Sequence, residues 1–473
     1  MRCTVIGHSS VFFETSGPTI LVDPWFSGSC YWRSWWHYPP MGDIDPAWLR
    51  PDYLYVTHDH FDHFHYPTIR KLDPATKVLV PRFGVDFMVG EFRRLGFKDV
   101  TELKHGRVTT LAPDVRVASY QYGFDDTLFV VADGDHTVID FNDCKIRGRP
   151  LQKVVKQMGE PDLVLKSHSF AQGYPNCYEA DDPKDLELVS RQTYFTDFIG
   201  TVDELKPRFA VPFASMVGFL HPESRHCNEH IVTPVEVVEA YRAASPTSGT
   251  EAITMAPGDT WDSTSGFERA DFDWYTDREK YLDECADLAA PAITRSLHEE
   301  SERTLTFESF SDFFLRFSRA VPRLAARFVI RKPLAFFVDG DAEPYWVMDV
   351  RRRKVWRSAT APVDVASIIK VAPGVMVDGI DNLIVHYVHI SMRFHTELKR
   401  DGTGTDLAFW SVLLFWELGY LPVRRLMRPR MVAVAWRRRA ELWSSARSIL
   451  GGRGSVIDRM SEQMAPKDPA PTS

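Results

Sequence analysis

The chain has 473 residues, of which 44% are hydrophobic and 25% are charged, and its formal net charge is −8 at pH 7. This composition is typical of a soluble globular protein and excludes disordered, collagen-like and disulfide-scaffold classes. The excess of acidic over basic residues argues against nucleic acid as a partner. The six cysteines form no C-x-x-C pair, so we expect free buried thiols and neither a zinc ribbon nor a Rieske iron–sulfur site.

The N-terminal region predicts strands that alternate with helices. The expected strands are short β-prone runs bounded by turn residues, at 3–6, 11–14, 19–22, 52–56, 77–80, 115–119, 128–132, 137–141, 163–166 and 208–211. The expected helices lie at 85–95, 151–158 and 192–204. Interleaved strands and helices over about 260 residues indicate an α/β fold, and we place this domain at residues 1–265.

The C-terminal region differs in pattern and predicts a smaller α+β domain at residues 290–455. Helices are expected at 271–303 and 307–329, a hairpin at 345–350 and 354–357, and further strands at 368–377 and 383–391. Asp406 is the expected N-cap of a helix at 407–418. Residues 456–473 are rich in small and polar side chains and predict a flexible tail.

Targeting and membrane signals are absent from the sequence pattern. The N-terminus runs directly into an expected strand without the apolar segment of a signal peptide. The most apolar stretch, 407–423, is interrupted by Glu417, Gly419 and Pro422 and is short for a bilayer span of about 20 residues. These features predict a cytoplasmic protein without a transmembrane segment.

The most informative motif is an H-x-H-x-D-H pattern directly after the expected strand at 52–56. Its members are His58, His60, Asp62 and His63. A chain that leaves a strand at this point can bring the four side chains together, and three imidazoles with one carboxylate suit Zn²⁺, iron or Mn²⁺. The pattern therefore predicts a metal site. The alternative interpretation is a solvated polar loop that happens to be rich in histidine.

On this motif, residues 1–260 resemble the metallo-β-lactamase superfamily. The resemblance implies an αβ/βα sandwich with metal ions at one edge of its sheets. In hydrolases of this type His58 and His60 would bind one metal, and Asp62 and His63 the other. Asp143 stands where the superfamily has its bridging carboxylate. The segments 7–9 (Gly-His-Ser) and 21–24 (Leu-Val-Asp-Pro) also resemble the opening strands of the lactonase-like branch.

Two histidines of the hydrolase pattern are replaced in this sequence. Gln121 and Tyr122 stand where one ligand is expected, and Ala214 stands where the last one is expected. His168 and His221 are candidate substitutes. The alternative for each is a hydrogen-bonded loop or core histidine. Two further histidines follow, His226 and His230.

These departures, together with an aromatic run at 28–40, resemble the catalytic region of the CMP-N-acetylneuraminate hydroxylase family. The segments 63–68, 142–144 and 212–222 carry the same resemblance, and that family also has Ala in place of the last ligand histidine. The resemblance implies an iron-dependent oxygenase with one or two iron ions. That family carries an N-terminal Rieske domain, whereas this sequence starts at the metal-binding fold, so a separate ferredoxin or Rieske electron donor is expected to act in trans.

The aromatic run predicts the wall of a substrate pocket, in which rings stack on a planar group and an arginine pairs with a phosphate or carboxylate. The candidates are Tyr31, Trp32, Arg33, Trp35 and Trp36. Tyr122 is a further candidate. The alternative is a tight loop packed over the sheet with the arginine in an internal ion pair.

Basic residues gather in the C-terminal region, at 351–354, 424–430 and 437–439, next to the apolar stretch at 407–423. One interpretation is a surface for anionic head groups or phosphates, which would allow peripheral contact with a membrane. The alternative is a core helix whose neighbours have solvated basic faces.

Together these features predict a metalloenzyme that acts on a small phosphate-bearing or lipid-like molecule. The favoured hypothesis is an iron-dependent hydroxylase with Asp62 and His221 as catalytic residues. A first alternative is a hydrolase with two zinc ions, of the lactonase, phosphodiesterase or esterase type, in which the metal lowers the pKa of bound water. A second alternative is a non-catalytic lipid or nucleotide carrier.

Overall fold

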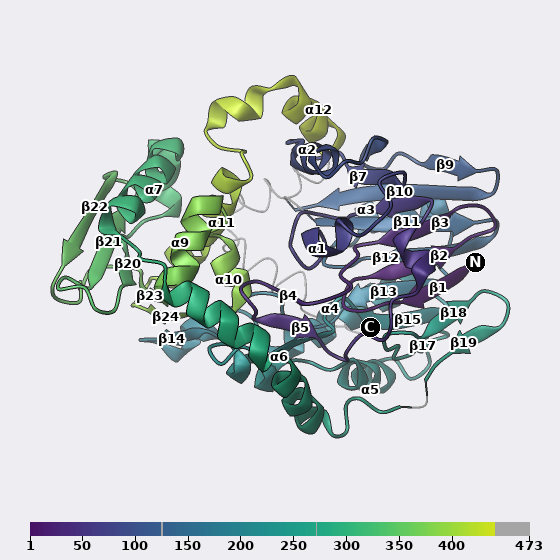
Figure 1. Ribbon diagram of the computed structural model, residues 1–473. Coiled ribbons are helices and arrows are strands. Elements are labelled where there is room, and N and C mark those ends of the chain that lie inside the picture. Colours follow the sequence, from purple (N-terminus) through teal and green to yellow (C-terminus); the bar gives the residue numbers. More distant parts are fainter. Residues whose placement is uncertain (124–125, 271, 440–473) are drawn as a thin grey trace, which may run out of the picture.

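The N-terminal region forms two β-sheets packed face to face, with helices on both outer faces (Figure 1). This computed structural model describes residues 1–123, 126–270 and 272–439. The first sheet has eight strands in the order β19-β18-β1-β2-β3-β6-β7-β8. They are β1 (Arg2–Val5), β2 (Val11–Glu14), β3 (Thr19–Val22), β6 (Tyr53–Tyr55), β7 (Lys77–Pro81), β8 (Val100–Leu103), β18 (Thr260–Asp262) and β19 (Gly266–Glu268).

The second sheet has seven strands in the order β17-β15-β13-β12-β11-β10-β9. They are β9 (Thr109–Ala112), β10 (Val115–Tyr122), β11 (Asp126–Asp133), β12 (His136–Asp140), β13 (Leu163–Ser167), β15 (Phe209–Phe213) and β17 (Glu251–Ala252). A small three-stranded sheet lies at the end of the sandwich. It consists of β4 (Ser29–Cys30), β5 (Trp35–His37) and β16 (Val217–Phe219).

Alternation of side chains along the strands explains the layers. In β2, Val11 and Phe13 pack between the two sheets, while Phe12 faces the outer helices. In β12, Val138 faces the inter-sheet core and Ile139 packs under helix α3. The predicted αβ/βα sandwich is therefore confirmed. Its helices are α1 (Tyr66–Ile69) and α2 (Phe87–Arg94) on the first sheet, and α3 (Arg149–Met158), α4 (Arg191–Leu205) and α5 (Pro234–Ala244) on the second.

The C-terminal region contains a six-stranded sheet in the order β14-β24-β23-β20-β21-β22. Its strands are β14 (Tyr178–Ala180), β20 (Leu334–Phe337), β21 (Tyr345–Asp349), β22 (Lys354–Ser358), β23 (Ser367–Val371) and β24 (Phe394–Leu398). Its helices are α6 (Arg278–Ser301), α7 (Phe307–Ala320), α8 (Arg323–Val329), α9 (Pro373–Asn382), α10 (Tyr387–Ser391), α11 (Thr403–Glu417) and α12 (Pro429–Arg437). The described residues also form four 3₁₀ helices, η1 (Pro46–Leu49), η2 (Pro183–Leu186), η3 (Arg225–His230) and η4 (Val423–Met427).

The two regions share strands and core residues. Strand β14 comes from the N-terminal region of the sequence, yet it pairs in parallel with β24, with Tyr178 opposite Thr396. Trp25 and Trp35 belong to the same hydrophobic cluster as Phe314 of helix α7. The C-terminal region therefore packs directly against the end of the sandwich, as Figure 1 shows.

Several expected elements differ from the structure. The predicted strand at 368–377 ends at Val371 because Pro373 begins helix α9, where proline is favoured at the first helical position. Residues 387–391, predicted as a strand, form helix α10; short apolar runs do not distinguish the two by periodicity. The segment 307–329 forms two helices instead of one, because the chain breaks at Val321 and Pro322.

The remaining corrections concern Asp406 and the strands after β15. Helix α11 begins at Thr403 after Gly402, so Asp406 lies inside its first turn and is not the N-cap. Strands β17, β18 and β19 follow the one expected to be last in the N-terminal region, because β18 returns to pair with β1. Residues 440–455 of the expected C-terminal domain and the expected tail at 456–473 lie outside the described residues. Among the described helices, none combines the length and apolarity needed to cross a membrane.

Candidate metal centre

The loop after β6 holds the four residues of the H-x-H-x-D-H motif. The backbone turns at once, because His63 and Phe64 both donate their N–H groups to the His60 carbonyl, at 3.0 and 2.6 Å. This turn places the His58 ring next to His60 and His63, with centroids 4.4 and 4.1 Å apart. The three imidazoles thus lie together at the carboxyl end of the strand.

Asp143, which follows β12, joins two of these histidines. Its Oδ2 lies 3.3 Å from His63 Nε2 and 4.0 Å from His58 Nε2. The three residues offer ligand atoms that all lie within 4.8 Å of one another. A second group of this kind contains His8, Asp62 and His63, in which Asp62 Oδ2 lies 2.9 Å from His8 Nε2 and 3.3 Å from His63 Nε2. His63 therefore belongs to both groups.

The buried Asp23 carboxylate sets the orientation of this loop. Its Oδ2 lies 2.7 Å from His63 Nδ1 and accepts the Thr57 hydroxyl at 2.6 Å, and its Oδ1 accepts the Thr57 N–H at 2.7 Å. Asn142 donates its side-chain amide to the same Oδ2 at 3.0 Å. A histidine that donates Nδ1–H to a carboxylate presents Nε2 as a ligand, which is the usual arrangement behind a metal-binding imidazole.

Burial and neighbouring charges set the protonation of the cluster. Burial, reinforced by the nearby imidazoles His63 and His60, holds the pKa of His58 well below its usual range, so this ring is neutral. Burial also acts to lower the pKa of His63, but the carboxylates of Asp62 and Asp23 outweigh it and raise that pKa. Burial acts to raise the pKa of Asp62, and His63 and His8 overcome it so that this pKa is low. The centre therefore combines ionised carboxylates with imidazoles.

These residues fit a metal ion. Among the described residues, the buried His58 Nε2 has no hydrogen-bond partner, while its Nδ1 lies 2.9 Å from the Thr57 hydroxyl. An unpartnered buried ring nitrogen is costly unless something binds it. The available donors are imidazole nitrogens and carboxylate oxygens, a set suited to zinc or to iron. We conclude that the loop is a candidate metal centre.

Among the described residues, His60, His168 and His221 belong to neither ligand group. His60 lies beside His58 in the same loop. His168 follows β13, with its Nδ1 3.3 Å from the Phe213 carbonyl, one residue before Ala214. The His221 Nδ1 accepts the Glu223 N–H at 3.2 Å. Burial lowers the pKa of both His168 and His221 to about 3, and Arg393 contributes for His221.

The two positions where hydrolases have further histidines are occupied by other contacts. The Gln121 side-chain amide donates to the Arg82 carbonyl at 2.7 Å. Ala214 is buried and has no donor atom. Tyr122 ends β10, next to the undescribed residues 124–125, and is half-buried.

The aromatic run forms a strained turn beside the metal-binding loop. Tyr31, Trp32 and Arg33 have positive φ angles of 52°, 52° and 63°, and each such residue costs about 1–2 kcal/mol. Tyr31 is buried, and its hydroxyl donates to Asp62 Oδ1 at 2.5 Å. Arg33 is exposed and donates to Ser29 Oγ at 3.2 Å. Trp35 is buried and Trp36 half-buried.

The C-terminal region holds this turn in place. Trp32 Nε1 donates to Asp378 at 2.8 Å and Trp35 Nε1 donates to the Ile390 carbonyl at 3.0 Å. Arg393, which is fully buried, donates to the Trp32 carbonyl at 2.9 Å and forms ion pairs with Glu223 and Glu300. The strained conformation thus depends on residues more than 300 positions away in the sequence.

Tyr387 of helix α10 contacts the metal-binding loop directly. Its hydroxyl donates to the Asp59 carbonyl at 3.0 Å, and its ring lies 5.7 Å from His60 and 5.6 Å from Tyr31 between centroids. Glu417 of helix α11 accepts the backbone N–H groups of Val385 and His386 at 2.8 and 2.9 Å, which positions the start of α10. The C-terminal region therefore covers one side of the candidate metal centre.

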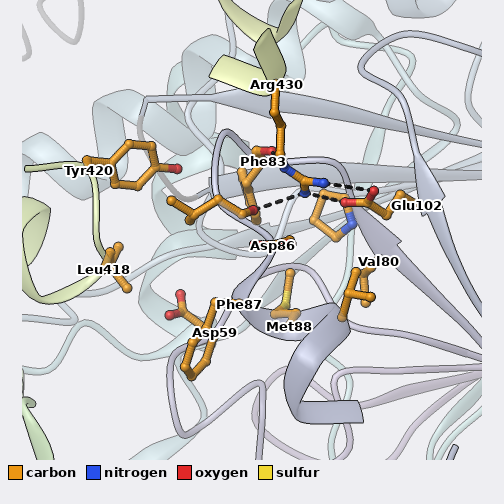
Figure 2. Close-up of a pocket in the computed structure, with 13 residues that line it drawn as sticks. Asp59, Val80, Phe83, Asp86, Phe87, Met88, Glu102, Leu418, Tyr420 and Arg430 are labelled. Atoms are coloured by element: carbon orange, nitrogen blue, oxygen red, sulfur yellow. Dashed lines mark hydrogen bonds and ion pairs between the residues drawn. The ribbon is translucent and has the colours of Figure 1, made fainter. Parts of the chain in front are cut away.

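A small, mainly apolar pocket has Asp59 in its wall (Figure 2). Its walls come from strand β7, the segment around helix α2, and the chain after α11, including Leu418 and Tyr420. Arg430 of α12 reaches into this region, donates to the Phe83 and Val85 carbonyls at 2.9 and 3.0 Å, and pairs with Glu102.

The sequence interpretation missed four residues of the centre, His8, Asp23, Asn142 and Tyr387. The segments that contain His8 and Asp23 were noted only as markers of the fold, although a histidine and an aspartate at strand ends are typical site residues. Asn142 lies next to Asp143, so its position was also visible. Tyr387 had no local signal, because its contact with Asp59 joins residues 328 positions apart.

Comparison with known proteins identifies the N-terminal region. The family model of the beta-lactamase superfamily domain matches residues 2–163. The protein has a metallo-β-lactamase fold. The match ends at the first residue of β13 (Leu163–Ser167), so it includes the H-x-H-x-D-H loop and Asp143 and leaves the C-terminal region uncovered.

Two relatives of this metallo-β-lactamase-fold protein have names that state a cofactor or an activity. A Mycobacterium tuberculosis protein assigned by name to the Rieske 2Fe-2S iron–sulfur proteins is 28% identical over 323 residues, covering 62% of this chain and 61% of that protein. Mouse cytidine monophosphate-N-acetylneuraminic acid hydroxylase is 22% identical over 247 residues, covering 48% of this chain and 41% of that one. The matches thus span about two fifths to three fifths of these relatives.

A hydrolase and a solved structure are also similar. A metal-dependent hydrolase of Exiguobacterium is 43% identical over 79 residues, covering 16% of this chain and 31% of that protein. The diiron β-hydroxylase CmlA of Streptomyces venezuelae has a TM-score of 0.38 at 21% identity, covering 57% of this chain and 54% of that one. The relatives therefore include both hydroxylases and hydrolases.

Proposed function

We propose that the protein is an iron-dependent oxygenase that hydroxylates a small molecule with electrons from an iron–sulfur donor. The observation that carries this proposal is the ligand set. His58, His63 and Asp143 converge within 4.8 Å, whereas Gln121 and Ala214 replace the two further histidines expected of a zinc hydrolase. Two imidazoles with one carboxylate are the ligand types of non-haem iron oxygenases, and this set supports iron over two zinc ions. The names of the mycobacterial and mouse relatives support the same chemistry.

The proposed metal ligands are His58, His60, Asp62, His63 and Asp143. His168 is a candidate to complete the set, because its ring lies beside the Phe213 carbonyl, next to Ala214. In the part of the chain that the structure describes, the buried Nε2 atoms of His168 and His221 have no hydrogen-bond partner. His221 stays a candidate catalytic residue. When bound, iron would supply the reductive activation of O₂.

The chain's own residues would orient the ligands and exclude water. Asp23 fixes the ring of His63, and the Thr57 hydroxyl fixes that of His58. Asp62 is held at both oxygens, by Tyr31 at Oδ1 and by His8 at Oδ2. The overall reaction consumes one O₂, two electrons and two protons. It inserts one oxygen atom into a substrate C–H bond and releases the other as water.

We place the substrate between the metal-binding loop and the aromatic turn. Trp32 and Trp36 are half-buried and Arg33 is exposed, so these side chains remain accessible beside the buried Tyr31. A planar, phosphate-bearing group could stack on the indoles and pair with the guanidinium.

A basic, apolar surface at η4 and α12 supports peripheral contact with an anionic membrane. The segment 423–439 contains seven arginines and no acidic residue. Its exposed apolar side chains are Val423, Leu426, Met427, Val432 and Trp436. Arginines beside exposed apolar residues are typical of segments that lie in a lipid interface. Arg430 anchors α12 beside the apolar pocket, so a lipid-like substrate would enter next to Asp59.

Metal analysis of protein purified under air tests the proposal. We expect bound iron, a visible absorption spectrum, and the loss of both in a variant with His58→Ala and His60→Ala. Stoichiometric zinc without iron, together with O₂-independent turnover of lactones, esters or phosphodiesters, would establish the hydrolase instead. Unchanged ligand binding and an intact cellular role in the same double variant would favour the carrier.

A further inference from the structure

A second cluster of metal-binding side chains lies at the junction of the two regions. Cys177 directly precedes strand β14, and His226 and Cys227 lie in the 3₁₀ helix η3. Their three ligand atoms lie within 4.8 Å of one another. Both cysteines are buried and His226 is exposed. The cluster shares no residue with the candidate metal centre.

The distances within the cluster match the edges of a tetrahedral zinc site. Cys177 Sγ and Cys227 Sγ are 3.7 Å apart, and Cys227 Sγ is 3.5 Å from His226 Nε2. With Zn–S bonds of about 2.3 Å and Zn–N bonds of about 2.0–2.1 Å, a tetrahedral ion separates two sulfurs by about 3.8 Å and sulfur from nitrogen by about 3.6 Å. Both sulfurs are free thiols, because a disulfide would bring them to about 2.05 Å.

We propose that Cys177, His226 and Cys227 bind a Zn²⁺ ion, with the fourth position open to water on the side of the exposed His226. Two cysteines and one histidine are the ligand types of many zinc sites, whereas the candidate metal centre offers only nitrogen and oxygen.

The ion would fasten the C-terminal sheet to the sandwich. The Cys177 carbonyl accepts the Thr396 N–H at 2.9 Å, one residue before β14 pairs with β24. On the other side, the Cys227 N–H donates to the Ser224 carbonyl, and the Ser224 side chain accepts the Ser34 hydroxyl at 2.8 Å in the aromatic run. A zinc ion here would therefore connect the edge of the C-terminal sheet to the segment that carries the aromatic turn.

Zinc and cobalt binding to the full chain test this site. The experiment uses the variant with His58→Ala and His63→Ala, which empties the candidate metal centre. We expect this variant to keep one equivalent of zinc, and its cobalt-loaded form to show sulfur-to-cobalt charge-transfer absorption. Adding Cys227→Ser or His226→Asn should remove that equivalent and the absorption. His226→Asn is informative because an exposed side chain can change without disturbing the core.

Cys285→Ser is the matched control, since Cys285 lies outside the cluster and is half-buried. It should retain the zinc and the cobalt absorption. The proposal would be overturned if Cys227→Ser and His226→Asn left the zinc content unchanged and the cobalt-loaded protein showed no charge-transfer absorption. The contact between the two sulfurs would then be a hydrogen bond between thiols. A mass two hydrogens lower under non-reducing conditions would identify a disulfide and would overturn it as well. Neither result bears on the iron proposed at His58 and His63.

Discussion

The N-terminal sandwich and the C-terminal region contribute differently to one site. The sandwich supplies the groups that fit a metal, His58, Asp62, His63 and Asp143, all at strand ends along one edge. The C-terminal region supplies Tyr387, Asp378 and Arg393, which hold the loop and the aromatic turn that surround those groups. The difference indicates that the candidate metal ligands come from the sandwich, while the C-terminal region positions the segments that surround them.

The largest expected effect on activity comes from changing the candidate metal ligands of the N-terminal sandwich. Replacing His58 and His63 with Ala should remove the metal from the candidate centre. Turnover should then fall on the order of 10³-fold, because a bound ion supplies several kcal/mol of the rate acceleration. Mass spectrometry measures the expected loss of metal, and an assay of O₂-dependent turnover measures the expected loss of activity. His136→Ala, at the opposite end of strand β12 from Asp143, should change neither quantity, and equal loss in this control would contradict the assignment.

Arg393→Met tests whether the C-terminal region holds the aromatic turn. The substitution leaves Glu223 and Glu300 without their buried partner and removes the hydrogen bond to the Trp32 carbonyl. Removing one partner of a fully buried ion pair costs about 3–5 kcal/mol of the free energy of unfolding, and we expect a smaller loss here because the Glu223 side chain is 40% exposed. Urea denaturation measures this loss. The surface pair between Lys370 and Glu397 is the control, where Lys370→Met should cost about 0–1 kcal/mol.

Neutralising the basic surface tests the contact with lipid. Changing Arg424, Arg428 and Arg437 to Gln should weaken binding to phosphatidylserine-containing vesicles by about 3 kcal/mol, or roughly 100-fold, at about 1 kcal/mol per arginine. Co-sedimentation with these vesicles measures the loss of binding. A matched variant that loses three charges at Arg351, Arg352 and Lys354 should bind vesicles like the unaltered protein. If both variants lose binding equally, the contact is not specific to η4 and α12.

Asp406 joins the two regions and makes their contact sensitive to pH. Its buried carboxyl accepts the Ser367 hydroxyl at 2.5 Å and the Tyr178 hydroxyl at 3.0 Å. Burial raises its pKa from 3.8 to about 6. Because the folded-state pKa exceeds the unfolded one, the carboxyl costs stability as pH rises from about 4 to about 6.

The free energy of unfolding of the Asp406→Asn variant should therefore be compared with that of the unaltered protein at two pH values. Between about pH 4 and about pH 7, we expect the difference to shift in favour of the variant by about 2 kcal/mol. Thermal or urea unfolding at the two pH values measures this difference. A relative stability that stays constant between them would show that the carboxyl does not titrate in this range.

The sequence predicted those parts of the molecule that depend on local patterns. The alternation of Val11, Phe12 and Phe13 is a local property of strand β2, and the sandwich follows from such runs. The grouping of His58, His63 and Asp143 was also predictable, because strand ends along one sheet edge lie close together. The ligation itself stays a prediction.

Contacts between distant segments could not be predicted in this way. The hydrogen bond from the Tyr31 hydroxyl to Asp62 had no local signal, because it depends on a turn with positive φ angles. The role of Tyr31 in substrate binding stays a prediction. Residues 387–391 were predicted as a strand because Val388 and Ile390 favour one. Their helix is set by Glu417, which accepts N–H groups at its start. The pairing of β14 with β24 has no local signal at all.

The most direct test of the central claim is the reaction of the iron-loaded, chemically reduced protein with O₂ in a single turnover. The account predicts that the protein consumes O₂ in proportion to its bound iron, with a change in visible absorption. The variant with His58→Ala and His63→Ala should consume none. The oxygenase proposal would be contradicted if protein that retains its iron left the O₂ concentration and the visible spectrum unchanged. Full activity of zinc-loaded protein in the absence of O₂ would contradict it as well.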